Sequence, residues 1–193
     1  MFPPASTCAV VLAAGGGSRF IASSHKLLAV LNGTAVYRHA LNAVHAAGFA
    51  HVIVVTGAVD LDLPDWVVAV RNAHWAQGQA TSLQCGIAAA DTFGADAVVV
   101  GLADQPFVTA QAWARVASSA DPIAVATYDG VRANPVRLHC SVWSDLPSEG
   151  DHGARSLMAA RPELVGEVAC PGSPADIDTM EDLQQWNLKT NSP

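Results

Sequence analysis

The sequence predicts an α/β fold in which a mainly parallel sheet is covered by helices on both faces, giving three layers. The chain has 193 residues, enough for one sizeable core, so we expect a single domain over residues 1–193. Hydrophobic residues make up 51% and charged residues only 14%, which excludes a disordered chain. Short runs rich in β-branched residues alternate with longer alanine-rich segments of helical period, as in βαβ units.

Five short apolar runs are the predicted strands of this sheet. They span residues 8–12, 52–56, 66–70, 97–102 and 123–127. Each has the usual length of a strand, and because each is apolar throughout, both of its faces are expected to be buried. The segment 129–140 differs, since Gly130 and the pair Asn134-Pro135 interrupt its extended pattern. We predict a turn or an edge strand there, not a central parallel strand.

Helical periodicity marks the segments 34–47, 81–90 and 109–119. The first carries one apolar stripe and is followed by Gly48, at the position where a left-handed residue ends many helices. In the third, Thr109 is the expected N-cap, and Trp113, Val116 and Ala117 are expected to face the sheet.

The charge of the chain argues against two classes of partner. Lys and Arg total 10 against 17 Asp and Glu, a net charge of -7, and no run of five basic residues occurs. A binding surface for nucleic acid or an anionic membrane is therefore not expected. The longest early apolar run, residues 8–14, is too short to cross a bilayer, and no basic residue precedes it. The simplest expectation is a soluble cytoplasmic protein.

The cysteines and histidines form no metal-binding pattern. Cys8, Cys85, Cys140 and Cys170 lie at least 30 residues apart, without a CxxC pair. We expect reduced and mostly buried thiols. None of the histidines is predicted to have a catalytic role.

A glycine-rich loop directly follows the first strand and is a candidate phosphate cradle. Backbone N–H groups can close around an anion there without interference from Cβ atoms, and Arg19 and Lys26 can neutralise phosphate charge. The loop is not a Walker A motif, because no Gly-Lys-Ser/Thr closes it, and Phe20 interrupts a G-x-G-x-x-G pattern. An ordinary tight turn is the alternative. The residues of the loop are Leu12, Ala13, Ala14, Gly15, Gly16 and Gly17.

Acidic residues follow at two places. Asp104 lies two residues beyond the end of the strand 97–102, so it is expected at the same sheet edge as the glycine loop. A carboxylate beside a phosphate loop suggests Mg²⁺, which needs few protein ligands but favours a second acid nearby. Asp176 and Asp178 would share one face of an extended segment, so either could be that acid. The alternatives are a turn cap for Asp104 and capping of the last helix by Thr179 or Asp178.

Two further loops enter helices. In the segment 72–86, helix N-terminal N–H groups together with Ser82 are candidates for binding a base, ribose or phosphate. In the segment 150–155, Asp151 and Arg155 stand at the start of a predicted helix. Simple capping is the alternative in both cases.

Taken in order, these segments resemble the molybdenum-cofactor nucleotidyltransferases, the MobA/MocA-like family. The resemblance covers nearly the whole chain. Each motif is weak alone, but their joint order and spacing are specific. The motifs are VVLAAGGGSR at 10–19, HKLL at 25–28, WAQGQATSLQCGI at 75–87, GLADQP at 101–106, NPV at 134–136, GDHGAR at 150–155 and DIDTMEDL at 176–183.

The resemblance implies a Rossmann-like nucleotide-binding fold of the glycosyltransferase-A type and transfer of a nucleotidyl group. A phosphate on the acceptor would attack the α-phosphorus of a nucleoside triphosphate and release pyrophosphate. With molybdopterin as acceptor, the product would be a dinucleotide cofactor for a molybdoenzyme or its chaperone. The implied catalytic residues are Arg19 and Lys26, which contact phosphates, and Asp104, which holds Mg²⁺ together with Asp178.

The resemblance also bears on which substrates bind where. A family loop that begins LAAG, as this one does, is associated with CTP, and one that begins LAGG with GTP; the methyl group of Ala14 would crowd a purine. The segment 78–86 is similar to the base-binding loop of methylerythritol-phosphate cytidylyltransferases, which implies cytosine contacts for Gly78 and Ser82. Asn134, Asp151 and Arg155 are the candidates for the acceptor side.

The chain departs from the family pattern between Arg19 and Lys26. The lysine follows the arginine by seven residues, two more than usual, and Phe20 and Ile21 replace Met-Gly. Two alternatives therefore stand beside a CTP-dependent enzyme of molybdenum cofactor synthesis. One is a nucleotidyltransferase for another phosphorylated small molecule. The other is a catalytically silent carrier of the nucleotide or cofactor.

Overall fold

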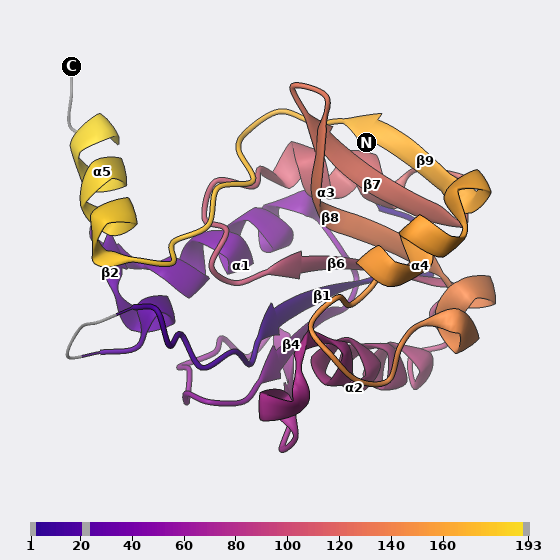
Figure 1. Cartoon of the computed structure of the whole chain (residues 1–193), viewed down its shortest axis with the longest axis horizontal. Coiled ribbons are helices and arrows are strands. Elements are labelled where there is room, and N and C mark those ends of the chain that lie inside the picture. The colour runs from indigo at the N-terminus through magenta and orange to yellow at the C-terminus, as the bar shows by residue number, and fades with distance from the viewer. Residues whose placement is uncertain (1–2, 21–23, 191–193) are drawn as a thin grey trace.

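A computed structural model describes residues 3–20 and 24–190 and contains a seven-stranded sheet of order β5-β4-β1-β6-β8-β7-β9 (Figure 1). Neighbouring strands run parallel except where β8 pairs with β6 and with β7. The predicted mainly parallel sheet is therefore confirmed. Its strands are β1 Thr7–Ala13, β4 Val52–Thr56, β5 Val67–Arg71, β6 Ala97–Leu102, β7 Ile123–Tyr128, β8 Val131–His139 and β9 Val165–Ala169.

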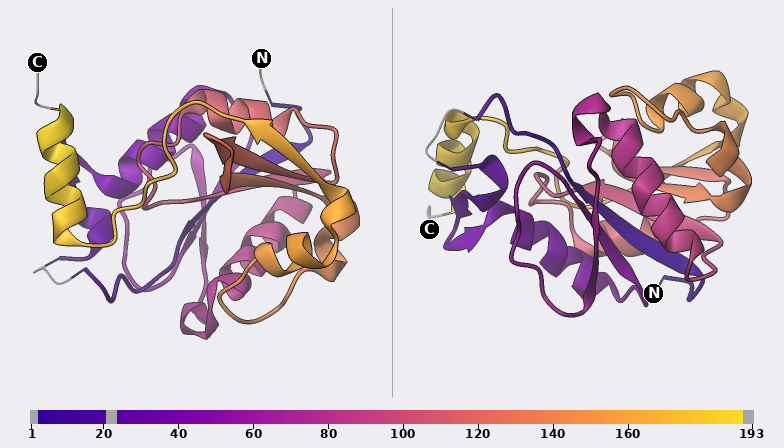
Figure 2. Two further views of the ribbon diagram at one scale, coloured as in Figure 1. Left: turned by 45° about the horizontal axis from the view of Figure 1, so that its top comes forward. Right: turned by 90° about the horizontal axis from the view of Figure 1, so that it is seen from below.

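Helices cover both faces of this sheet, which gives the predicted three layers. Figure 2 (left) shows α1 and α3 above the sheet, and α2 and α4 below it. The α-helices are α1 Val36–Ala47, α2 Gln79–Asp91, α3 Ala110–Ala117, α4 Arg155–Ala160 and α5 Met180–Thr190. The other elements are β2 Val30–Leu31, β3 Thr34–Ala35 and the 3₁₀ turns η1 Lys26–Leu28, η2 Trp75–Gln77, η3 Cys140–Asp145 and η4 Pro162–Leu164.

Each central strand contributes to two cores because its side chains alternate between the faces of the sheet. In β1, Val11 packs in the core with Leu41 of α1 and Trp113 of α3. Val10 packs on the opposite face with Leu83 of α2 and Leu157 of α4. The cores on the two faces are thus built on the same strands.

The predicted helix signals are confirmed with small shifts at the ends. Gly48 follows α1 in the left-handed conformation, with φ 82°. The hydroxyl of Thr109 accepts a hydrogen bond from the N–H of Ala112 and caps α3. The first helix begins two residues later than predicted because Thr34 and Ala35 form β3.

The prediction for 129–140 was wrong in one respect: β8 lies inside the sheet, between β6 and β7. It forms a hairpin with β7 and runs antiparallel to both neighbours. Its pairing with β7 shifts register, because Val125 pairs with Val136 and Ala126 pairs with Ala133. Asn134 and Pro135 lie in this interruption, so a residue without an N–H group is accommodated inside a central strand.

Two expectations about burial also need correction. β5 forms one edge of the sheet, and its residues are half-buried or exposed instead of buried on both faces. Its hydrophobic residues therefore do not by themselves indicate a central position. The cysteines are free thiols, but Cys8 is buried, Cys85 and Cys170 are half-buried, and Cys140 is exposed. The prediction that the thiols are mostly buried was therefore wrong.

A small third core holds α5 at one end of the molecule, beside β2 (Figure 1). Ile177 and Leu183 pack there with Phe20, Leu31 and Val36. This packing brings the acidic segment before α5 to the chain that follows the glycine loop. Within residues 3–20 and 24–190, no helix is long and apolar enough to cross a membrane.

Candidate functional site

The glycine loop and Asp104 lie side by side at the carboxyl ends of β1 and β6. These strands are parallel neighbours, with Leu12 paired to Leu102. The N–H of Ala103 donates to the carbonyl oxygen of Leu12 at 3.0 Å, which extends the pairing to the sheet edge. The predicted common edge is therefore confirmed.

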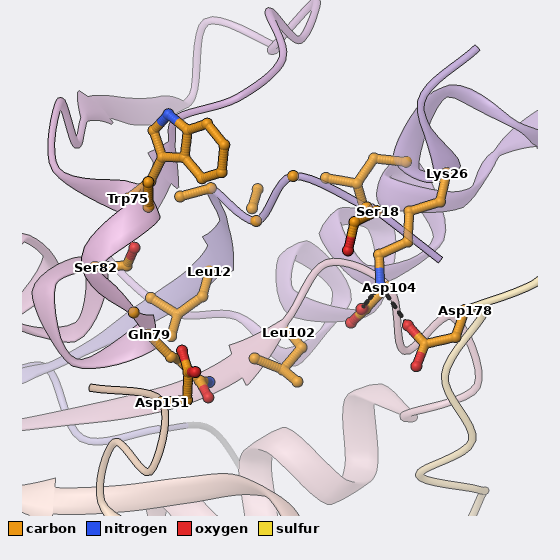
Figure 3. Close-up of a pocket in the computed structure, with 18 of the residues that line it drawn as sticks. Leu12, Ser18, Lys26, Trp75, Gln79, Ser82, Leu102, Asp104, Asp151 and Asp178 are labelled. Carbon is orange, nitrogen blue, oxygen red and sulfur yellow. Dashed lines mark hydrogen bonds and ion pairs between the residues drawn. The ribbon is translucent and has the colours of Figure 1, made fainter. Parts of the chain in front are cut away.

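A cavity of about 420 Å³ opens at this edge (Figure 3). Figure 3 shows Lys26, Asp104 and Asp178 at one end, and Trp75 and Ser82 at the other. Thirteen of the fifteen predicted site residues line it: Leu12, Ala13, Ala14, Gly15, Gly16, Gly17, Arg19, Lys26, Gly78, Ser82, Asp104, Asp151 and Asp178. Asn134 and Arg155 do not, and lie in a neighbouring cavity.

Lys26 is the centre of the charged end. Its Nζ donates to Oδ2 of Asp104 at 2.5 Å and to Oδ1 of Asp178 at 2.6 Å. Arg19, whose side chain is 77% exposed, pairs with the second oxygen of Asp178 at 2.9 Å. Burial lowers the pKa of Lys26, but attraction to the two carboxylates outweighs burial and raises it overall. Lys26 therefore stays charged beside the glycine loop.

The backbone brings Asp178 to Asp104 across a long stretch of sequence. The N–H of Ile177 donates to the carbonyl oxygen of Asp104 at 2.9 Å, and Ile177 is fully buried. Thr179 caps α5 through its hydroxyl, which accepts from the N–H of Asp182 at 3.1 Å. The capping alternative thus holds for Thr179 but not for Asp178, whose carboxylate faces Lys26.

Asp104 and Asp178 together fit a divalent cation that also binds nucleotide oxygens. Oδ1 of Asp104 is buried and has no hydrogen-bond partner among the described residues. Hard cations such as Mg²⁺ are held by one or two carboxylates, completed by water and phosphate oxygens. The described part of the chain has no group of three His, Cys, Asp or Glu side chains that would form an all-protein metal site. Asp176, the other candidate acid, is exposed and lines neither of these two cavities.

The other end of the cavity is built by the loop before α2. Asn72 is buried, and its Nδ2 donates to the hydroxyl oxygens of Thr81 and Ser82 at 2.8 and 2.9 Å. These bonds leave the hydroxyl hydrogen of Ser82 free to donate toward the cavity that Ser82 lines. Trp75 closes this end against the glycine loop, since a Cβ at Gly16 would lie 3.0 Å from its ring.

The segment 150–155 packs directly on that loop. Gly78 has φ +112°, and a Cβ there would lie 2.4 Å from the carbonyl carbon of Gly150, so this position requires glycine. The N–H of Ala80 donates to the carbonyl oxygen of Gly150 at 2.9 Å. Ala154 is the N-cap of α4 and no side chain caps that helix, so the capping alternative for Asp151 is wrong.

A second cavity of about 340 Å³ adjoins the first. The two share Leu12, Gln79 and Leu102. Its polar lining residues are Gln79, Arg132, Asn134, His152 and Arg155. Its apolar lining comes from Leu12, Leu83, Val100, Leu102, Val125, Val136, Leu138 and Met158, with Ala133, Ala154 and Ala159.

Sequence reasoning missed several residues of the site. Ser18, Trp75, Gln79 and Leu102 line the first cavity without having been singled out. Trp75 and Gln79 lie inside both the candidate loop 72–86 and the quoted motif 75–87, but neither residue was named there as a site residue. His25 contacts the glycine loop, although no role was predicted for any histidine: its Nε2 lies 2.9 Å from the carbonyl oxygen of Gly15.

A family model described as the MobA-like NTP transferase domain matches residues 9–165. The chain belongs to this family. A sequence relative is the purine catabolism protein PucB of Bacillus subtilis, 29% identical over 93% of each chain. A nucleotidyl transferase from Methanothermobacter thermautotroptrophicus has the same fold, with a TM-score of 0.80, 25% identity and coverage of 96% of this chain and 99% of that one.

A third relative adds a metal. A Mycobacterium tuberculosis protein solved in complex with manganese superposes with a TM-score of 0.74 at 28% identity, over 94% of this chain and 98% of that one. The family and these neighbours confirm the Rossmann-like fold class, and they support nucleotidyl transfer as the activity of this chain.

Proposed function

We propose that this chain transfers a cytidylyl group from CTP to the phosphate of a molybdopterin-type acceptor and releases pyrophosphate. The observation that carries the proposal is the pair of adjoining cavities at one sheet edge. The first combines a glycine-rich loop, two cations and two carboxylates, as a triphosphate site requires. The second adjoins it at Leu12 and Leu102, where an acceptor can approach the nucleotide.

In the proposed reaction, an oxygen of the acceptor phosphate forms a bond to the α-phosphorus of CTP. The bond from that phosphorus to the oxygen that bridges to the β-phosphate breaks, and its electron pair leaves with pyrophosphate. Negative charge grows on the phosphate oxygens during this exchange. Lys26 and Arg19 line the cavity together with the glycine loop, and these cations and the N–H groups of the loop would stabilise that charge.

Asp104 and Asp178 would hold Mg²⁺, which would neutralise charge on the triphosphate oxygens. Oδ1 of Asp104, which is buried and has no hydrogen-bond partner within residues 3–20 and 24–190, supports this assignment. The manganese found with the mycobacterial relative also supports it. Lys26 now donates to both carboxylates, so its ammonium group would turn to a phosphate oxygen when nucleotide and cation arrive together.

The proposal of CTP as the nucleotide rests on the end of the first cavity that Trp75 and Ser82 line. Ala14 is buried and packs in the same core as Leu83 of α2, so its methyl group lies on the side of the sheet where the base would enter. Ser82 is held by Asn72 and has a hydroxyl hydrogen to offer to a base oxygen. A pyrimidine would meet less crowding from this methyl group than a purine.

The second cavity favours an acceptor with an apolar ring system over a simple polyol phosphate. Most of its lining is aliphatic, while Asn134 and the exposed Arg155 lie among the polar residues. Nδ2 of Asn134 donates to Oε1 of Gln105 at 3.2 Å, which fixes the amide. A flat ring could cover the aliphatic surface while Arg155 attracts an anionic group.

The proposal is tested by measuring pyrophosphate release from CTP and from GTP with molybdopterin, an inositol phosphate and a sugar phosphate as acceptors. Release that requires CTP, Mg²⁺ and molybdopterin supports it. Release with another acceptor would establish a nucleotidyltransferase for a different small molecule. Tight binding of CTP or molybdopterin without any release would instead indicate the silent carrier.

A further inference from the structure

The imidazole ring of His25 joins the glycine loop to the turn that carries Lys26. Its Nε2 lies 2.9 Å from the carbonyl oxygen of Gly15. Its Nδ1 accepts a hydrogen bond from the N–H of Leu27 at 3.2 Å and so caps η1. Gly15 and Lys26 are eleven positions apart in the chain, but this one side chain spans the two elements.

The partners of the ring fix its protonation state. A carbonyl oxygen only accepts, so Nε2 must carry a hydrogen, and a backbone N–H only donates, so Nδ1 must be bare. The ring is therefore the neutral Nε2–H tautomer. Burial lowers the pKa of His25, which favours the same neutral form. Because both ring nitrogens are committed to the backbone, His25 has no nitrogen left to exchange a proton with a substrate.

The contact also sets the direction of a backbone N–H group. The carbonyl of Gly15 and the N–H of Gly16 belong to one planar trans peptide, so they point in opposite directions. When His25 holds the carbonyl, the N–H of Gly16, a residue that lines the cavity, is turned away from the ring. Packing is tight beside this contact, because Gly17 has φ +60° and a Cβ there would lie 3.0 Å from Nε2 of His25.

We propose that His25 is a positioning residue for the nucleotide phosphates. It holds the glycine loop and Lys26 at a fixed separation and keeps the carbonyl oxygen of Gly15 away from the phosphate oxygens that it would repel. This inference rests on the proposed nucleotide site but not on the identity of the base or the acceptor.

Three substitutions separate the two contacts of the ring. His25→Gln keeps a donor at a similar reach for Gly15 but loses the cap. His25→Asn keeps an acceptor for Leu27 but is too short to reach Gly15, and His25→Leu loses both. We expect KM for the nucleotide to rise about threefold to tenfold in His25→Asn and His25→Leu, the effect of one lost hydrogen bond, with kcat little changed. His25→Gln is expected to stay within about twofold of the unmodified protein.

His39 supplies a matched control. Its Nε2 also lies 2.9 Å from a carbonyl oxygen, that of Leu31, and it does not line the cavity. His39→Leu is expected to lower thermal stability without changing KM for the nucleotide. Nucleotide affinity in His25→Asn equal to that of the unmodified protein would overturn the positioning role. So would an effect of equal size in His25→Gln and His25→Asn, which would indicate a general loss of structure.

A spectroscopic measurement tests the geometry without nucleotide. Long-range ¹H–¹⁵N spectra of the free protein at neutral pH are expected to show the His25 ring as the Nε2–H tautomer, assigned by its disappearance in His25→Asn. The Nδ1–H tautomer or a charged ring would overturn the inference. An unmodified protein that shows this tautomer yet binds neither CTP nor GTP would instead overturn the proposed function.

Discussion

At the scale of single residues, the two carboxylates of the charged end should control turnover. Replacing Asp104 or Asp178 by Ala removes one ion-pair partner of Lys26 and, under the proposed function, one ligand of the divalent cation. We expect each variant to lose at least about 100-fold in metal-dependent kcat, by analogy with loss of one group that stabilises transition-state charge. Circular dichroism should show an intact fold.

Asp60→Ala is the matched control for these variants. Asp60 also pairs with a cation, Arg71, but its side chain is 95% exposed and it lies outside the cavity. An exposed pair contributes little to stability and nothing to the cation site, so this variant should keep normal turnover. Near-normal turnover in both Asp104→Ala and Asp178→Ala would remove the metal assignment.

The methyl group of Ala14 should set the preference between CTP and GTP. Ala14→Gly opens the side of the cavity that faces α2, so we expect the ratio of kcat/KM for CTP to that for GTP to fall. Ala13→Gly raises the conformational entropy lost on folding by a similar amount. The methyl group that it removes, however, packs in the opposite core with α1 and α3. The ratio should therefore stay constant in Ala13→Gly. If the two variants behave alike, Ala14 has no part in base selection.

At the scale of elements, the start of α5 couples stability to the site. Thr179 and Asp182 form a reciprocal cap, in which the Thr179 hydroxyl accepts from the N–H of Asp182 and the Asp182 carboxylate accepts from the N–H of Thr179 at 2.8 Å. Thr179→Ala should cost about 1 kcal/mol of unfolding free energy, measured in urea. It should also weaken Mg²⁺-dependent nucleotide binding, because Asp178 directly precedes the cap. Thr179→Ser keeps the hydroxyl and should restore both properties.

The same cap predicts that the free energy of unfolding depends on pH. Burial raises the pKa of Asp182, but hydrogen bonds from Thr179 and from the N–H of Asp178 outweigh burial and hold that pKa below its usual value. A carboxylate whose pKa is lowered by folding stabilises the fold at any pH above the pKa that it has in the unfolded chain, which is about 3.9 for Asp. It loses this contribution as the pH falls through the pKa of the folded state. Asp182→Asn should therefore be less stable than the unmodified protein at pH 7, and the difference should shrink below about pH 4. A difference that stays constant from pH 7 to pH 3 would contradict this assignment.

At the scale of the whole molecule, the sequence predicts those features that depend on local pattern. The parallel strands, the cap at Thr109 and the position of Asp104 after β6 follow from short runs of residues. The place of β8 inside the sheet does not follow from local pattern. It depends on a hairpin with β7 and on pairing with β6, a strand distant in the sequence. The role of His25 was missed for the same reason, since its partner Gly15 is known only once the loop has folded back.

The sharing of strands between cores predicts how residues 1–193 unfold. Val10 and Val11 are neighbours in β1 but belong to opposite cores, so neither core can lose this strand alone. We expect one cooperative thermal transition, with coincident curves from far-UV circular dichroism and from tryptophan fluorescence, to which Trp113 and Trp143 contribute from opposite faces. Two separated transitions would show that the cores unfold independently and would contradict a single domain.

Nucleotide binding should raise the midpoint temperature of that single transition without splitting it. The cavity is assembled from β1, β6, the N-terminus of α2 and the segment before α5, so the site exists only when all of these are folded. CTP with Mg²⁺ at 100 times its Kd should add about 2.7 kcal/mol to the free energy of unfolding. For a chain of this size, Tm should therefore rise by roughly 5 to 10 °C. GTP and NAD should shift the transition less, and Asp104→Ala should abolish the dependence on Mg²⁺. A larger shift with GTP than with CTP would overturn the choice of base but leave the shared nucleotide site in place.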